Sequence, residues 1–246
     1  MFGFSFDRRT LYIIMAVLII ISLARYMSSP EQLLGLVLTL PAVLVAITFH
    51  EYAHAFVADK LGDDTPRRQG RLTLNPIAHL DPIGSIMLVF VGFGWGKPVE
   101  INPRNFNRDI SMSKGEALVS VAGPAMNIVL AFLFTIIYCL IIKFAPSFLI
   151  TQAGAITVIL LQEIIIINVG LGIFNLIPLP PLDGSKILRH FLPYNAREWF
   201  IRNEQIFYAI FIVIWITGIG STIISPIINA VYTGITNLVA HLFGIG

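Results

Sequence analysis

Charged residues are scarce in this sequence. Of its 246 residues, 12% are Asp, Glu, Lys or Arg, 56% are hydrophobic, and the mean hydropathy is +0.82. A soluble domain carries about 25% charged residues, so this composition excludes an ordinary soluble fold. It predicts an all-α polytopic membrane protein, in which apolar helices cross the bilayer.

Cysteine and clustered positive charge are also lacking. The single cysteine, Cys139, lies in an apolar run and cannot form an internal disulfide. The formal net charge is only +2, and the basic residues are scattered through short loops. These features argue against a disulfide scaffold and against a nucleic-acid partner. Without internal repeats, residues 1–246 are predicted to form a single membrane-embedded domain.

Six apolar stretches are candidate membrane spans, since about 20 helical residues cross about 30 Å of hydrocarbon. The ranges are 10–27, 33–58, 117–142, 154–178, 206–224 and 226–243. The first follows Arg8 and Arg9 as a signal peptide would, but it lacks a small-residue cleavage site and is predicted to be retained. Only Ser225-Pro226 separates the last two, as a turn or as a kink.

The loop between spans two and three contains an apolar piece, Ile83 to Trp95, that is too short to cross the bilayer. Turn-forming pairs flank it, among them Asp81-Pro82 and Lys97-Pro98. A re-entrant or hairpin element is therefore predicted between helices 2 and 3.

Basic residues predict how the spans are oriented, because short loops rich in Lys and Arg stay in the cytoplasm. Six spans place all the Lys and Arg residues except Arg25 and Lys143 in the N-terminus, the 59–116 loop and the 184–205 loop. Both termini and the ends of spans two and four are therefore predicted to be cytoplasmic. The compact chain suits a prokaryotic plasma membrane.

The second span ends in His50-Glu51-Tyr52-Ala53-His54. Helical periodicity places His50 and His54 on one face, where two imidazoles can bind one metal ion. A catalytic zinc site has three protein ligands and an open position for water, and Glu51 could take a proton from that water. Ionisable groups near the bilayer centre cost about 2.5 to 3.5 kcal/mol each. Three within five residues therefore predict a functional site with one Zn²⁺ per chain.

The best candidate for the third ligand is Asp183. Three prolines in the preceding residues 176–182 must break span four, and such backbone must face protein or a water-filled cavity. The alternative role of Asp183 is a helix N-cap. Glu100 and Glu116 are alternative ligands, although both lie in charged loops.

These motifs resemble the site-2 protease family of intramembrane zinc metalloproteases. Its pattern joins His-Glu-x-x-His to a later Asn-x-x-Pro-x-x-x-x-Asp-Gly, which matches residues 175–184, and Ala-Gly-Pro-x-x-Asn matches residues 122–127. Small prokaryotic members without a PDZ or CBS domain are the most similar. The resemblance implies a three-span catalytic core over about residues 33–190. It also implies regulated intramembrane proteolysis, with transmembrane proteins as substrates; oligomeric state stays open.

Two asparagines in these motifs are further candidates. The resemblance implies a substrate or oxyanion contact for Asn175, whose amide can donate to developing negative charge. The alternative is that Asn175 satisfies carbonyls freed by Pro178. For Asn127, both contact with substrate and an interhelical hydrogen bond are open.

Other polar residues allow rival readings. Glu163 is predicted to be a hydrogen-bonded acid inside the bundle, and His79 a surface or structural histidine, with substrate-facing roles as alternatives.

A metal or proton transporter would also use intramembrane His and Asp, but that function does not explain why Glu51 adjoins His50. A serine protease using Ser221 and His241 lacks a group that activates the serine.

Overall fold

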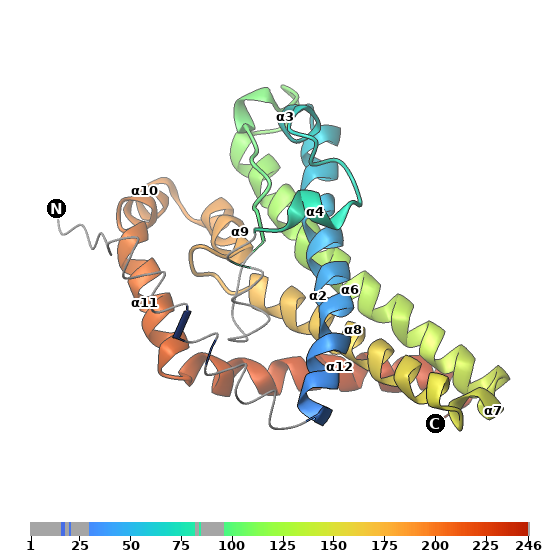
Figure 1. Ribbon diagram of the computed structural model, residues 1–246. Coiled ribbons are helices and arrows are strands. Elements are labelled where there is room, and N and C mark those ends of the chain that lie inside the picture. The colour runs from blue at the N-terminus through green and yellow to red at the C-terminus, as the bar shows by residue number, and fades with distance from the viewer. Residues whose placement is uncertain (1–15, 18–19, 21–29, 82–83, 85–95, 246) are drawn as a thin grey trace.

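The computed structural model describes residues 16–17, 20, 30–81, 84 and 96–245 (Figure 1). Their regular elements are helices, and Leu80 and Gly96 form an isolated antiparallel bridge. The helices are α2 (Pro30–Lys60), α3 (Thr65–Arg68), α4 (Pro76–His79), the 3₁₀ helix η1 (Pro103–Asn105), α6 (Met112–Phe144), α7 (Pro146–Leu149), α8 (Gln152–Asn175), α9 (Asp183–Phe191), α10 (Tyr194–Arg202), α11 (Glu204–Ile216) and α12 (Ile219–Leu242). The predicted all-α fold is confirmed.

Four helices of the described part are long and apolar enough to cross a membrane. They are residues Gly35–Lys60 of α2, and the whole of α6, α8 and α12. Helix α11 is apolar but has only 13 residues. These helices make the chain an integral membrane protein. The first predicted span, 10–27, and the predicted re-entrant piece, Ile83 to Trp95, lie largely outside the described residues.

Of the two predictions for Ser225-Pro226, a turn or a kink, the turn is wrong because Pro226 lies inside a helix. Helix α11 ends earlier, and Gly218 follows with φ of +74°, a left-handed conformation that a residue without Cβ adopts at little cost. Helix α12 then runs unbroken from Ile219 and contains Pro226. A proline removes one intrahelical hydrogen bond, and the remaining bonds of this long helix continue past it.

The core lies where the long helices cross. Helices α2, α6 and α8 pack against one another, and α12 packs across α6 and α8 (Figure 1). One buried cluster joins three of these helices: Ala131 and Cys139 from α6, Ile165 and Val169 from α8, and Ile235 and Val239 from α12. Cys139 is thus a packed core residue. The three predicted core spans, α2, α6 and α8, contact one another. Helices α6 and α8 therefore pack against α2, which carries the histidines.

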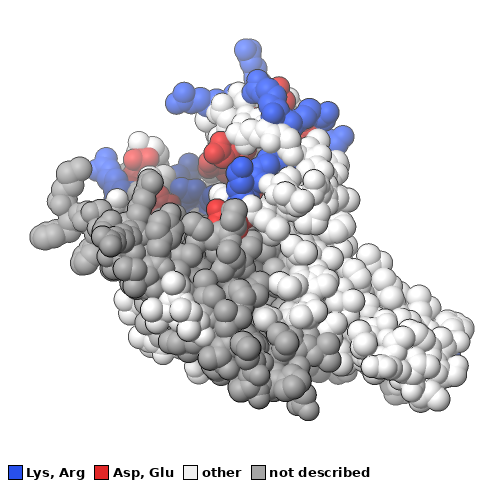
Figure 2. Space-filling view, in the orientation of Figure 1, with Lys and Arg blue, Asp and Glu red and all other residues white. Residues whose placement is uncertain are grey.

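Charged residues gather at one end of the molecule, around α3 and α10, whereas the visible surface of the long helices is mostly uncharged (Figure 2). Buried Asp63 anchors the loop after α2, because its carboxylate accepts hydrogen bonds from Thr65, Asn102 and Asn105. Burial alone would raise the pKa of Asp63, but these hydrogen bonds hold the pKa below its usual value. The two ends of this loop are therefore fixed beside the end of α2.

Candidate active site

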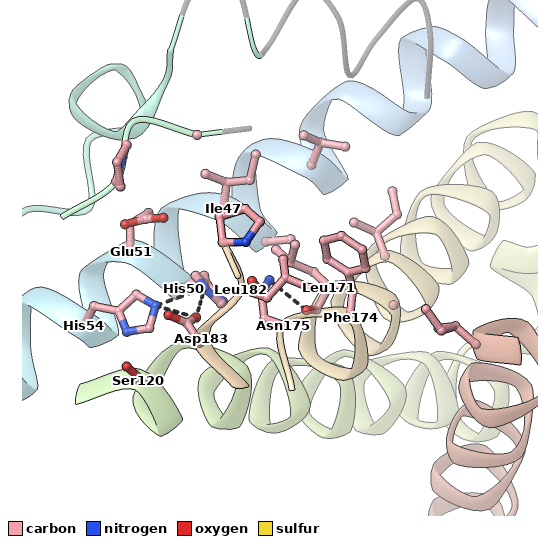
Figure 3. Close-up of a pocket in the computed structure, with 18 of the residues that line it drawn as sticks. Ile47, His50, Glu51, His54, Ser120, Leu171, Phe174, Asn175, Leu182 and Asp183 are labelled. Atoms are coloured by element: carbon pink, nitrogen blue, oxygen red, sulfur yellow. Dashed lines mark hydrogen bonds and ion pairs between the residues drawn. The ribbon is translucent and has the colours of Figure 1, made fainter. Parts of the chain in front are cut away.

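The histidines of α2 meet Asp183 in a buried group (Figure 3). The Nε2 atoms of His50 and His54 are 3.0 Å apart. Asp183 Oδ2 lies 3.2 Å from His50 Nε2 and 3.1 Å from His54 Nε2. Three potential ligand atoms therefore converge on one point, as the sequence predicts for a metal site.

The donor set fits zinc. His54 Nδ1 lies 2.7 Å from the carbonyl oxygen of Val119, and His50 Nδ1 lies 2.6 Å from Asn127 Oδ1. A carbonyl oxygen only accepts, so His54 carries its hydrogen on Nδ1 and presents the lone pair of Nε2 to a metal. Two neutral imidazoles and one carboxylate match a catalytic zinc site that keeps a fourth position for water.

The proline-containing turn after α8 places Asp183. Helix α8 ends at Asn175, and α9 begins at Asp183, whose N-cap is Leu182. The alternative of Asp183 as an N-cap is therefore wrong. Its Oδ2 faces the histidines, and its Oδ1 lies 3.8 Å from Lys186 Nζ. A Cβ at Gly184 would collide with the carbonyl oxygens of Leu176 and Ile177, so the Asp-Gly pair permits this tight return of the chain.

Glu51 lies beside the metal group and is oriented by backbone. Its Oε2 accepts a hydrogen bond of 3.0 Å from the amide of Val99. Buried Arg71 fixes the segment before Val99 by donating to the carbonyl oxygens of Ala78, Lys97 and Pro98. Sequence reasoning missed Arg71, because a basic loop residue gives no sign of which distant carbonyls it will bind.

A cavity of about 770 Å³ extends from the metal group between the long helices. Its apolar lining includes Ile47, Leu171, Phe174, Phe211, Trp215 and Ile228. Asn175 also lines the cavity and donates a 3.0 Å hydrogen bond from Nδ2 to the carbonyl oxygen of Leu171. The predicted role of Asn175 in catalysis remains a prediction.

Asn127 is fully buried, and all its polar capacity faces protein. Its oxygen faces His50, while its amide donates to Ala46 O and Asn168 Oδ1. Of the two roles left open for Asn127, its position favours the interhelical hydrogen bond over contact with substrate.

The other candidates lie apart from the metal group. Glu100 is exposed and accepts from Gln69, and neither it nor Glu116 belongs to the His50, His54 and Asp183 group. Half-buried Glu163 lies 3.5 Å from the Thr39 hydroxyl. Of the two positions predicted for His79, surface or structural, the structural one agrees with the structure: the residue is fully buried and its Nε2 bonds Thr73 O, because α4 folds against α2.

Comparison with known proteins agrees with this geometry. The profile described as Peptidase family M50 matches residues 38–218, which include all three metal-group residues. The chain belongs to Peptidase family M50. This is the site-2 protease family that the sequence motifs resemble, so the chain is a zinc metalloprotease and the transporter alternative is not retained.

Several curated relatives are similar over most of their length. The Bacillus subtilis protein named "Putative zinc metalloprotease YwhC" is 38% identical over 220 residues, which cover 89% of this chain and 97% of the relative. Rip2 of Mycobacterium tuberculosis is 27% identical over 85% of this chain and 75% of its own length. MJ0611 of Methanocaldococcus jannaschii is 27% identical over 86% of this chain and 98% of its own length. No solved structure matches the chain.

Proposed function

We propose that this M50 peptidase hydrolyses peptide bonds within transmembrane segments of other membrane proteins. The supporting observation is the position of the cavity: it is lined by residues of α2, α8 and α12, each long and apolar enough to span the bilayer. A substrate that reaches His50 and Glu51 between such helices arrives as an apolar segment. We further propose that such a cut releases a membrane-tethered regulator.

The residues of the site divide the chemistry among them. His50, His54 and Asp183 would hold Zn²⁺, which, when bound, lowers the pKa of a water molecule towards about 7 and polarises a carbonyl. Glu51 accepts a proton from the attacking water and passes it to the leaving amine. Asn175 is proposed to donate to the developing oxyanion. A helical peptide bond is shielded by its own hydrogen bonds, so Gly, Pro or Asn near the cut favours cleavage.

Removing the metal tests the proposal directly. The purified protein is placed in vesicles with a single-span peptide that carries Gly and Pro in its membrane segment, and cleavage is followed by mass spectrometry. We expect a zinc chelator to abolish cleavage and stoichiometric Zn²⁺ to restore it. A soluble peptide of the same cleavage sequence is the control, and preferential cleavage of that control would contradict an intramembrane substrate.

We also propose that the active site opens towards the cytoplasm. The orientation of the active site follows from the excess of Lys and Arg in the loops around α3 and α10 (Figure 2), because short loops rich in Lys and Arg stay in the cytoplasm. The predicted cytoplasmic C-terminus does not agree with this orientation, because Lys143 Nζ at the far end of α6 donates a 2.8 Å hydrogen bond to the carbonyl oxygen of Phe243.

Labelling from one side of the membrane tests this orientation. With Cys139 replaced by Ala, a cysteine at exposed Gln69 should react with an impermeant maleimide only in inside-out vesicles. A cysteine at Ile150, which is 88% exposed beside α7 at the other end of α6, should react only in right-side-out vesicles. The reverse pattern would overturn the proposal.

A further inference from the structure

Asn168 lies inside α8, fully buried and outside the metal group. It is connected to that group by a chain of hydrogen bonds across three helices. Asn168 Oδ1 accepts from Asn127 Nδ2 of α6 at 2.9 Å, and Asn127 Oδ1 lies 2.6 Å from His50 Nδ1 of α2. This series of hydrogen bonds therefore ends on the ring nitrogen of His50 that points away from the metal position.

Backbone carbonyls determine which atom of each asparagine amide donates and which accepts. Asn168 Nδ2 donates to Ile164 O at 2.8 Å, and Asn127 Nδ2 also donates to Ala46 O at 3.1 Å. A backbone carbonyl can only accept, so each amide must turn its NH₂ group towards that carbonyl and its oxygen the other way. Flipping either amide would set two acceptors against each other in a buried site and would leave the displaced donor without a partner, which is unfavourable.

The consequence reaches the metal position. Because Asn127 presents an oxygen to His50, the imidazole must carry its hydrogen on Nδ1. Nε2 is then left with the lone pair that a metal requires. His54 achieves the same state through one carbonyl, that of Val119, whereas His50 depends on two asparagine amides.

We propose that Asn168 is a positioning residue that, through Asn127, holds His50 in the tautomer competent to bind zinc. The inference rests on the proposed zinc chemistry but concerns a residue that belongs neither to the metal group nor to the cavity lining. A merely structural Asn168 would link α8 to α6 without affecting the affinity for zinc.

The test is zinc affinity rather than cleavage. Asn168→Leu keeps the approximate shape of the side chain and removes both hydrogen bonds. Asn168→Ser keeps a hydroxyl that can bond Ile164 O but is too short to reach Asn127. We expect both variants to raise the Kd for Zn²⁺ by about 10- to 100-fold, measured by competition with a chromophoric chelator. The visible spectrum of the Co²⁺-loaded protein should change as the imidazole of His50 shifts.

Thr135→Val is the matched control. Thr135 is also fully buried in a spanning helix, and its hydroxyl bonds only Ala131 O within α6 among the described residues. This variant should keep the zinc affinity and the cobalt spectrum of the wild type. Wild-type affinity in Asn168→Leu or Asn168→Ser, or equal weakening in Thr135→Val, would overturn the inference. A wild-type protein that binds no zinc would instead refute the metal site itself.

Discussion

Glu51→Gln is expected to keep its zinc and to lose nearly all turnover. The amide has the size of the carboxylate and can still accept the hydrogen bond from Val99, so the segment beside the cavity should stay in place. It cannot accept a proton from water, and general acid–base catalysis contributes on the order of 10² to 10⁴ in rate. The measurement is zinc per molecule alongside kcat for the single-span peptide in vesicles.

Glu100→Gln is the matched control for this loss of one carboxylate. Glu100 is exposed and bonds Gln69, away from the cavity, so its variant should keep both zinc and kcat. Near-normal cleavage by Glu51→Gln would refute Glu51 as the base. Loss of zinc from Glu100→Gln would make Glu100 and Glu116 candidates for the third zinc ligand again.

The residues of the candidate metal group could be predicted from the sequence because local rules bring them together. Helical periodicity brings His50 and His54 together over one turn. A cluster of ionisable residues in an apolar span indicates a functional site, because burying such residues in the bilayer is unfavourable. Asp183 follows a run of prolines that must leave the helix, which places it where water can enter. In both cases the signal lies within a few residues.

The supporting residues could not be predicted in this way, because their roles depend on tertiary packing. Nothing near Arg71 indicates that its guanidinium will bind the carbonyls of Lys97 and Pro98. Asn168 was only one polar residue among several in its span, and its bond to Asn127 depends on how α6 and α8 cross. The helix boundary was misplaced for a related reason: Pro226 is a strong local breaker, but Gly218 makes the actual turn.

Gly123→Ala is expected to remove zinc and, with it, activity. Gly123 lies in α6 directly against both imidazoles. A Cβ at this position would stand 2.5 Å from His54 Nε2 and 2.6 Å from His50 Cε1, closer than real Cβ contacts allow. The histidines are buried and their Nδ1 atoms are already held by Val119 and Asn127, so they cannot retreat without breaking those bonds. One added methyl group must therefore separate the ligand atoms.

Zinc content and thermal stability together decide this prediction. Gly123→Ala should contain almost no zinc after purification, and added Zn²⁺ should not restore cleavage. Gly234→Ala in α12 is the control, since no atom outside the helix's own backbone and the neighbouring residues lies within 4 Å of its added Cβ, and it should bind zinc normally. If Gly123→Ala and Gly234→Ala lowered the unfolding temperature equally, the loss would reflect a general effect of alanine in these helices. A folded Gly123→Ala protein with a full complement of zinc would mean that His50 and His54 do not both bind the metal as arranged against α6.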